Sequence, residues 1–127
     1  MEELTAVDQE LVHRLVQVYA EGARDADPDQ VGSIFAEDAC MWGWLGDDYV
    51  SAPIAAFLDV VRASRDDPDR SADYAFRIVQ ITMRLRMAVV VFEETGYLGQ
   101  SFTNAFTFLK RDGRWLAVSK TFTAPAR

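Results

Sequence analysis

The sequence predicts an α+β fold in which helices come first and an antiparallel sheet follows. Before residue 65, apolar residues recur at the three- and four-residue spacings of amphipathic helices. From Ala72 onward these spacings stop, and apolar runs of strand length alternate with turn residues. Helices followed by consecutive strands are typical of α+β domains. At 127 residues the chain supports one core and is too short for two, so we expect one domain over 1–127.

The first predicted helix covers roughly residues 6–24. Thr5, followed three residues later by Asp8, resembles a capping box, which satisfies the free backbone N–H groups at a helix start. Apolar residues then recur along one face, which we expect to point inward. This stripe consists of Val7, Leu11, Leu15, Val18 and Gly22.

Two further helices and one strand are predicted before residue 65. A short helix begins at Pro28, with Asp27 as its N-cap and Gln30 closing the box. Residues 39–45 form a strand that ends at a turn over 46–48. Pro53 then opens a third helix. Its inner stripe is Ile54, Phe57, Leu58 and Val61.

Four strands follow, over about 73–83, 86–95, 100–110 and 114–123. The turn between the last two has the clearest sequence pattern, because Asp-Gly stands between two apolar strands at 112–113. The turn near residue 85 has no comparable pattern. We therefore predict the hairpin at the end of the chain and leave the pairing across residues 83–87 open.

A register for the last hairpin follows if Gly113 is the left-handed residue of a three-residue bulged turn. Phe106 then faces Val118, and Asn104 faces Lys120. A two-residue turn would shift the pairing by one residue and mix apolar with polar positions. The bulged turn instead gives one apolar face, interrupted by Asn104 and Lys120, that we expect to pack against the helices. Its apolar members are Phe102, Phe106, Phe108, Leu116, Val118 and Phe122.

Composition and charge exclude several classes of function. The formal net charge of −7 repels phosphate backbones and anionic membranes, so neither nucleic acid nor a membrane is an expected partner. The first residues are acidic and lack an apolar stretch, which argues against a secretory signal and favours a cytoplasmic location. His13 is the single histidine and Cys40 the single cysteine, so we expect no metal site and no cofactor.

The run Met87–Phe92 is apolar at every position, which predicts that both faces of its strand are covered. Helices can cover one face of a single sheet. We therefore expect a homodimer in which a second subunit covers the outer face. The alternative is a chance apolar run on a partly exposed strand.

Several short motifs follow one another in a defined order: Val18-Tyr19, Asp27-Pro28, Ile34 to Ala39, Phe102-Thr103-Asn104, Leu109 to Trp115, and Lys120-Thr121-Phe122. Their order and spacing resemble the nuclear-transport-factor-2-like (NTF2-like) superfamily. Within it the chain is most similar to the small bacterial proteins labelled SnoaL-like or "putative lumazine-binding". The resemblance implies a cone-shaped half-barrel in which three N-terminal helices pack on a curved antiparallel sheet around a deep apolar pocket, usually in a homodimer. The superfamily includes isomerases, dehydratases, epoxide hydrolases, polyketide cyclases and non-enzymatic binders.

The resemblance to ketosteroid-isomerase-like members of the superfamily also implies roles for single residues. Their oxyanion-binding tyrosine falls on Tyr19 and their second hydrogen-bond donor on Asn104, whereas their carboxylate base falls on Gly43, which has no side chain. Glu93 and Glu94 are adjacent on a strand, so one of them at most can enter the pocket.

These residues favour a domain that binds a small apolar or aromatic molecule in the cone. The first alternative is an enzyme of the isomerase, cyclase or dehydratase type that uses Tyr19, Asn104, Lys120 and one of Glu93 or Glu94. The second is a dimeric protein-interaction module. The expected pocket residues are Tyr19, Trp42, Trp44, Phe57, Phe102, Asn104, Phe106, Val118, Lys120 and Phe122.

Overall fold

The structure is a computed structural model, and it describes residues 5–67 and 73–126. Helices precede a run of strands, which confirms the α+β class, and a sixth strand, β2, adds to the five expected. The elements are α1 (Ala6–Arg24), α2 (Pro28–Gly32), β1 (Phe35–Leu45), β2 (Asp48–Pro53), α3 (Ile54–Ala63), a 3₁₀ turn (Ser64–Asp66), β3 (Ala75–Arg84), β4 (Met87–Tyr97), β5 (Gln100–Arg111) and β6 (Arg114–Ala124).

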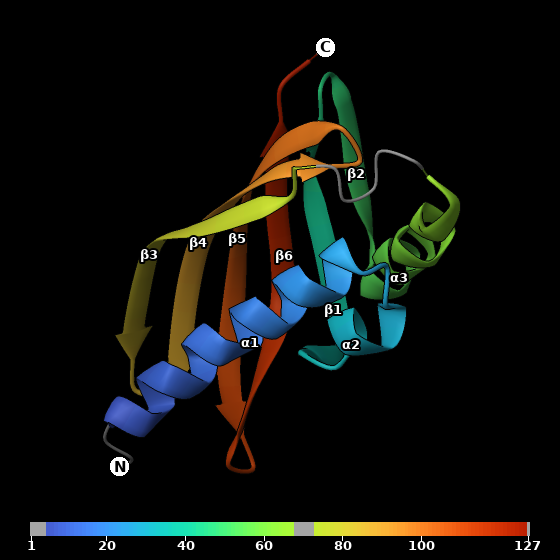
Figure 1. The fold of residues 1–127 in the computed structure, drawn as a ribbon. Coiled ribbons are helices and arrows are strands. Elements are labelled where there is room, and N and C mark those ends of the chain that lie inside the picture. Colours follow the sequence, from blue (N-terminus) through green and yellow to red (C-terminus); the bar gives the residue numbers. More distant parts are fainter. Residues whose placement is uncertain (1–4, 68–72, 127) are drawn as a thin grey trace.

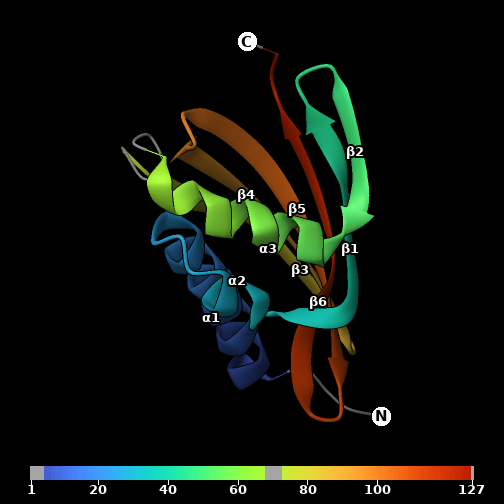
Figure 2. The same cartoon turned by 90° about the vertical axis from the view of Figure 1, so that its right-hand side faces the viewer.

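The strands form one curved sheet whose concave face is covered by the helices (Figures 1 and 2). The strand order is β2-β1-β6-β5-β4-β3, with β1 and β6 parallel and every other pair antiparallel. In Figure 2 the sheet bends around α1 and α3, which lie on the same side of it. This bend leaves room between the concave face and the helices. No helix of the described residues is long and apolar enough to cross a membrane.

The inner face of α1 differs by one position from the predicted stripe. The capping box is confirmed, since the Thr5 side chain accepts from the Asp8 backbone N–H and the Asp8 carboxylate accepts from the Thr5 N–H. However, Val7 is 62% exposed, and the buried apolar residues are Val12, Val16, Tyr19, Ala20 and Ala23. Asp8 explains the rotation, because its buried carboxylate accepts hydrogen bonds from Trp115 Nε1 and Lys110 Nζ. These bonds turn the face with Val12, Val16 and Tyr19 toward the sheet, in place of the predicted stripe.

The strand β2 was not predicted. It pairs with β1 through a two-residue turn between Leu45 and Asp48, in which Gly46 has a φ of +58°. That left-handed conformation suits glycine, which has no Cβ. Val50 and Ala52 alternate with exposed residues along β2 and face inward. The sequence therefore contained a period-two pattern, but it was too short to distinguish from a loop.

The predicted register of the last hairpin is wrong. Arg111 pairs with Arg114, so Asp112 and Gly113 form a two-residue turn, and both have positive φ values, 52° and 77°. This is the type I′ geometry that matches the twist of antiparallel strands.

A bulge within β6 then corrects the mixing of faces that such a turn would cause. Thr107 pairs with Ser119 and Phe108 with Ala117, so Val118 is an extra residue. Before the bulge Trp115 and Ala117 are buried, and beyond it Lys120, Phe122 and Ala124 are buried. Phe106 therefore pairs with Lys120 and Asn104 with Phe122, in place of the predicted Val118 and Lys120. Leu116, predicted on the inner face, is half-buried on the outer one.

Candidate functional site

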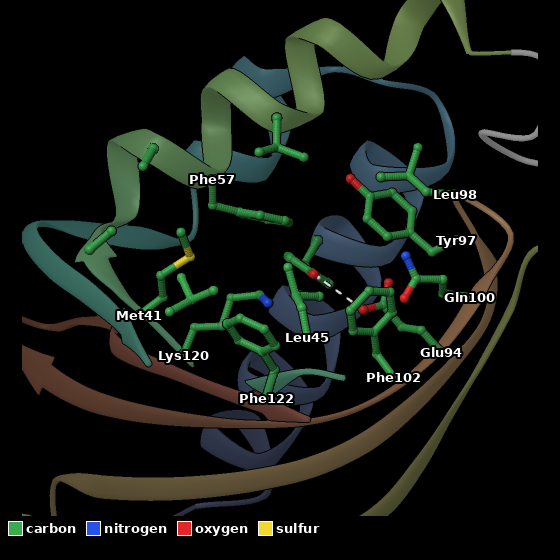
Figure 3. Close-up of a pocket in the computed structure, with 15 residues that line it drawn as sticks. Met41, Leu45, Phe57, Glu94, Tyr97, Leu98, Gln100, Phe102, Lys120 and Phe122 are labelled. Atoms are coloured by element: carbon green, nitrogen blue, oxygen red, sulfur yellow. Dashed lines mark hydrogen bonds between the residues drawn. The ribbon is translucent and has the colours of Figure 1, made fainter. Parts of the chain in front are cut away.

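A cavity of about 350 Å³ lies between the concave face of the sheet and the helices α1 and α3 (Figure 3). Its walls are mainly apolar. The polar groups on its surface belong to Tyr19, Glu94, Tyr97, Gln100 and Lys120. The apolar lining consists of Met41, Leu45, Val50, Ala52, Ala56, Phe57, Val60, Leu98, Phe102 and Phe122.

Glu94 is the centre of a buried hydrogen-bond network at the cavity. Its side chain is 1% exposed, and its Oε1 accepts from the Tyr19 hydroxyl at 3.2 Å and from Asn104 Nδ2 at 2.8 Å. Its Oε2 accepts from the Tyr74 hydroxyl at 2.7 Å. The alternation of β4 explains the placement, because neighbouring residues of a strand face opposite sides. Glu93 accordingly lies on the outer face, where it pairs with Arg77.

Lys120 is the second buried ionisable group of the cavity, at 4% exposed. Its Nζ donates to Asn104 Oδ1 at 3.4 Å and lies 4.5 Å and 4.3 Å from the ring centroids of Phe57 and Phe122. Burial lowers the pKa of Lys120 to about 8, and the charge of Glu94 opposes this shift. Asn104 thus connects the carboxylate to the amine, using its amide nitrogen for one and its oxygen for the other.

The charge of Glu94 follows from its partners. Burial raises the pKa of the Glu94 carboxyl, while the charge of Lys120 and hydrogen bonds from Tyr74, Asn104 and Tyr19 act in the opposite direction. Both carboxyl oxygens accept bonds from these donors. The carboxylate form satisfies all three donors, whereas a protonated carboxyl would need one tyrosine hydroxyl to accept instead of donate. Glu94 therefore has a higher proton affinity than an exposed glutamate.

Tyr97 contributes an unused hydrogen-bonding group. Its hydroxyl is buried and is the one buried side-chain polar atom in the described part of the chain that has no hydrogen-bond partner. Burial, and secondarily the charge of Glu94, raise the pKa of Tyr97, so the hydroxyl remains protonated and able to donate. Figure 3 shows the hydroxyl directed toward the interior of the pocket, across from the Lys120 nitrogen.

Comparison with known proteins agrees with this architecture. Residues 7–123 match the protein family described as "Putative lumazine-binding". The chain belongs to this family. A search of the curated proteins found no match.

Solved structures show the NTF2-like fold of this family member. An NTF2-like protein of unknown function from Shewanella baltica is 23% identical and has a TM-score of 0.85, with 98% of this chain and 100% of that chain covered. A second one, from Methylobacillus flagellatus, is 23% identical with a TM-score of 0.85, with 98% and 97% covered. A ketosteroid isomerase-like protein from Erwinia carotovora atroseptica is 14% identical with a TM-score of 0.71, with 97% and 100% covered. The expected putative lumazine-binding family and the NTF2-like fold are therefore confirmed.

The NTF2-like cone brings together only part of the predicted pocket. Tyr19, Phe57, Phe102, Lys120 and Phe122 line the cavity. Asn104 lies behind it, bonded to Glu94 and Lys120. Phe106 is fully buried in the core, where its ring packs edge-on against Tyr19, with ring centroids 4.9 Å apart. Val118 is the bulge residue of β6 and is absent from the cavity lining.

The prediction that Trp42 and Trp44 line the pocket is wrong. They are 39% and 49% exposed, whereas Met41 and Gly43, which alternate with them along β1, are buried. The two tryptophans share one strand parity, as expected, but that parity belongs to the outer face. The close approach of Gly43 to Phe122 fixes it, because a Cβ on Gly43 would lie 2.6 Å from carbons of the Phe122 ring. The same crowding leaves no room for a carboxylate base at Gly43.

Tyr74 and Tyr97 were missed as site residues. Tyr97 has the parity of the outer-facing Glu93, yet it is buried, because the pairing of β4 and β5 slips by one residue between Glu94 and Tyr97. Gly96, with a φ of 71°, lies in this irregularity. A glycine inside a strand often marks a bulge, so this residue was the sequence feature that could have indicated the slip. No group of three His, Cys, Asp or Glu in the described residues converges as a metal site would require.

Proposed function

We propose that this protein binds a small, largely apolar or aromatic molecule in the cone. The observation that carries the proposal is the buried Tyr97 hydroxyl, which lacks a partner at the wall of an apolar cavity of about 350 Å³. Buried polar groups in folded proteins are nearly always hydrogen-bonded, so an unpaired one at a cavity indicates a bound acceptor. Apolar walls with a few polar groups are typical of small-molecule pockets.

Direct binding measurements test this function. A thermal-shift screen of the purified chain, followed by calorimetry, would compare aromatic ketones, the matching hydrocarbons and lumazine, which the family description names. We expect ligands with an acceptor to bind about tenfold more weakly to Tyr97→Phe, because one hydrogen bond to a buried donor is lost. Tyr49→Phe, at an exposed position on β2, is the matched control. If no member of the panel bound the wild type, the proposal would be wrong.

A second candidate function is catalysis of the isomerase, cyclase or dehydratase type. The observation that favours it is Glu94, a carboxylate of raised pKa on the cavity wall that accepts from Tyr19 and Asn104. Such a group can remove a proton next to a carbonyl. The test is exchange of α-hydrogens of a bound ketone with D₂O, followed by NMR, in wild type and Glu94→Gln. Exchange that requires Glu94 supports catalysis, and binding without exchange supports the first function.

We further propose that the protein is a homodimer whose contact is the outer sheet face. That face exposes large apolar side chains, including Trp42, Trp44 and the 44%-exposed Met87. Sedimentation at micromolar concentration should therefore show a dimer that Val91→Glu, at a half-buried outer position of β4, dissociates. Val7→Glu, on the solvent side of α1, should leave it intact. A wild-type monomer would contradict the homodimer and leave this face for a different protein.

A cytoplasmic location is the last part of the proposal. Cys40 is a free thiol, and free thiols persist in reducing compartments. Fractionation of cells that express a tagged chain, with marker enzymes for each compartment, would check the location.

A further inference from the structure

We propose that Lys120 is a nucleophilic amine that forms a covalent imine with an aldehyde or ketone held in the cavity. The inference rests on the proposed function, because the carbonyl compound must first enter the cone. It goes beyond that function in naming a bond-forming residue and the chemical class of ligand with which it reacts.

The placement of Lys120 is unusual for a lysine. Its Nζ lines the cavity from β6, beneath α3, and projects into it between the rings of Phe57 and Phe122 (Figure 3). It makes no direct ion pair with a carboxylate of the described residues, and its hydrogen bond is to the neutral amide of Asn104. Burial in such surroundings costs more free energy for an ammonium ion than for a neutral amine.

The same surroundings keep a part of the Lys120 side chains in the unprotonated, nucleophilic form near neutral pH. The ionisable groups that share the cavity with Lys120 are Glu94, which Asn104 connects to it, and the hydroxyls of Tyr19 and Tyr97. With a pKa of about 8, roughly a tenth of Lys120 is unprotonated at about pH 7. An exposed lysine has several hundred times less free base at that pH. Desolvation of this kind is a known route to lysines that react with carbonyl compounds.

The reaction needs no other reagent. The nitrogen lone pair of Lys120 attacks the carbonyl carbon, and the C=O π electrons move to oxygen as the C–N bond forms. The proton lost by nitrogen goes to that oxygen and gives a carbinolamine. A second proton transfer from nitrogen lets the C–O bond break, so one water leaves and a C=N bond remains. Glu94, which lines the same cavity, can take up and return the proton between these steps.

The chain provides its own control, because it contains two lysines, Lys110 and Lys120. Lys110 Nζ lies 3.1 Å from Asp8 Oδ1, and its side chain is more accessible than that of Lys120. Its nitrogen is held by the Asp8 carboxylate and does not face the cavity lining. A labelling experiment therefore compares a buried, unpaired amine with a more accessible, paired one in the same molecule.

The test is reductive trapping of the full chain with 2-naphthaldehyde and sodium cyanoborohydride near pH 7.5, with peptide mapping by mass spectrometry. We expect adduct at Lys120 to exceed adduct at Lys110 by at least about tenfold, in line with the difference in free base. Lys110→Arg should keep the adduct, and Lys120→Arg should lose it. In the unaltered chain, excess 2-naphthalenemethanol should block labelling of Lys120 and leave labelling of the α-amino group unchanged.

Two outcomes would overturn the inference, and they differ in what they say of binding. If calorimetry shows that the alcohol binds in the cone but the aldehyde gives no adduct at Lys120, the imine is excluded and the binding function remains. If neither the alcohol nor the aldehyde binds, no adduct forms and no member of the screening panel binds, both proposals are excluded. The competition measurement uses unaltered protein, so it decides between these outcomes even if Lys120→Arg does not fold.

Discussion

Glu94 and Lys120 are connected through the side-chain amide of Asn104 and not by a direct ion pair. Asn104 donates to Glu94 at 2.8 Å and accepts from Lys120 at 3.4 Å. The three residues come from β4, β5 and β6, which are neighbours in the sheet. An amide can satisfy both an anion and a cation at once, because it carries a donor and an acceptor. The arrangement links two buried ionisable groups without a direct ion pair and leaves the amine open to the cavity.

Replacement of Asn104 by leucine should destabilise the fold strongly. The variant keeps the volume but leaves the buried Glu94 without its closest Oε1 donor and Lys120 without its acceptor. We expect the free energy of unfolding to fall by about 3 kcal/mol, the scale of leaving buried charged groups unsatisfied. Urea denaturation measures it. Thr103→Val, on the neighbouring exposed position, should change it by less than about 0.5 kcal/mol. Equal effects of both variants would show that the network does not support the fold.

The pH dependence of the free energy of unfolding should reveal the lowered pKa of Lys120. Its folded pKa of about 8 lies below the unfolded value of 10.5, so folding favours the neutral amine. Its contribution is therefore complete above pH 10.5 and is lost as the pH falls through 8. From about pH 7 to about pH 9.5, we expect the wild type to gain about 2 kcal/mol relative to Lys120→Met.

Urea denaturation of both proteins across this range gives the difference. The raised pKa values of Tyr19, Tyr74 and Tyr97 keep these tyrosines protonated in the folded protein, and their ionisation in the unfolded chain is common to both proteins and cancels in the difference. A difference that did not change with pH would mean that the burial of Lys120 does not disfavour its charge.

The sequence predicted the layers of this fold better than the faces of its strands. Helix starts depend on local chemistry, and the capping box at Thr5 and the N-cap at Asp27 were both found from their neighbours. Strand faces depend on register, and one extra residue reverses them. The extra residue at Val118 and the irregularity after Glu94 are set by pairing across the sheet. Tyr97 was consequently missed as a cavity residue.

The outer placement of Trp42 and Trp44 has a related cause. Both faces of β1 offer apolar residues, so composition alone could not choose between Met41 and the tryptophans. The contact between Gly43 and Phe122 decides it, and that contact joins residues far apart in the sequence. Asn104 and Lys120 were found because two polar residues on an apolar face are conspicuous in the sequence itself.

Gly43 should not tolerate any side chain. In Gly43→Ala the new Cβ would lie 2.6 Å from the Phe122 ring and closer still to its backbone oxygen, which the β1–β6 pairing holds in place. We expect a loss of about 3 kcal/mol or more in the free energy of unfolding. Gly113→Ala is the matched control, since nothing lies within 4 Å of the added Cβ and only its φ of +77° opposes it. That variant should lose about 1 kcal/mol. A fully stable Gly43→Ala protein would show that β1 and β6 separate easily.

Deletion of Val118 should leave Lys120 in the cavity. Val118 is the extra residue of β6, so its removal turns the bulge into a regular ladder and keeps Phe106 opposite Lys120. Deletion of Thr121, which lies in the regular ladder beyond the bulge, should instead move Phe122 to the outer face. We therefore expect cooperative unfolding and ligand binding to survive the first deletion and to be lost in the second. Denaturation and calorimetry compare the two. If both deletions abolished folding, the bulge itself, through the bend it gives β6, would be required to close the cone.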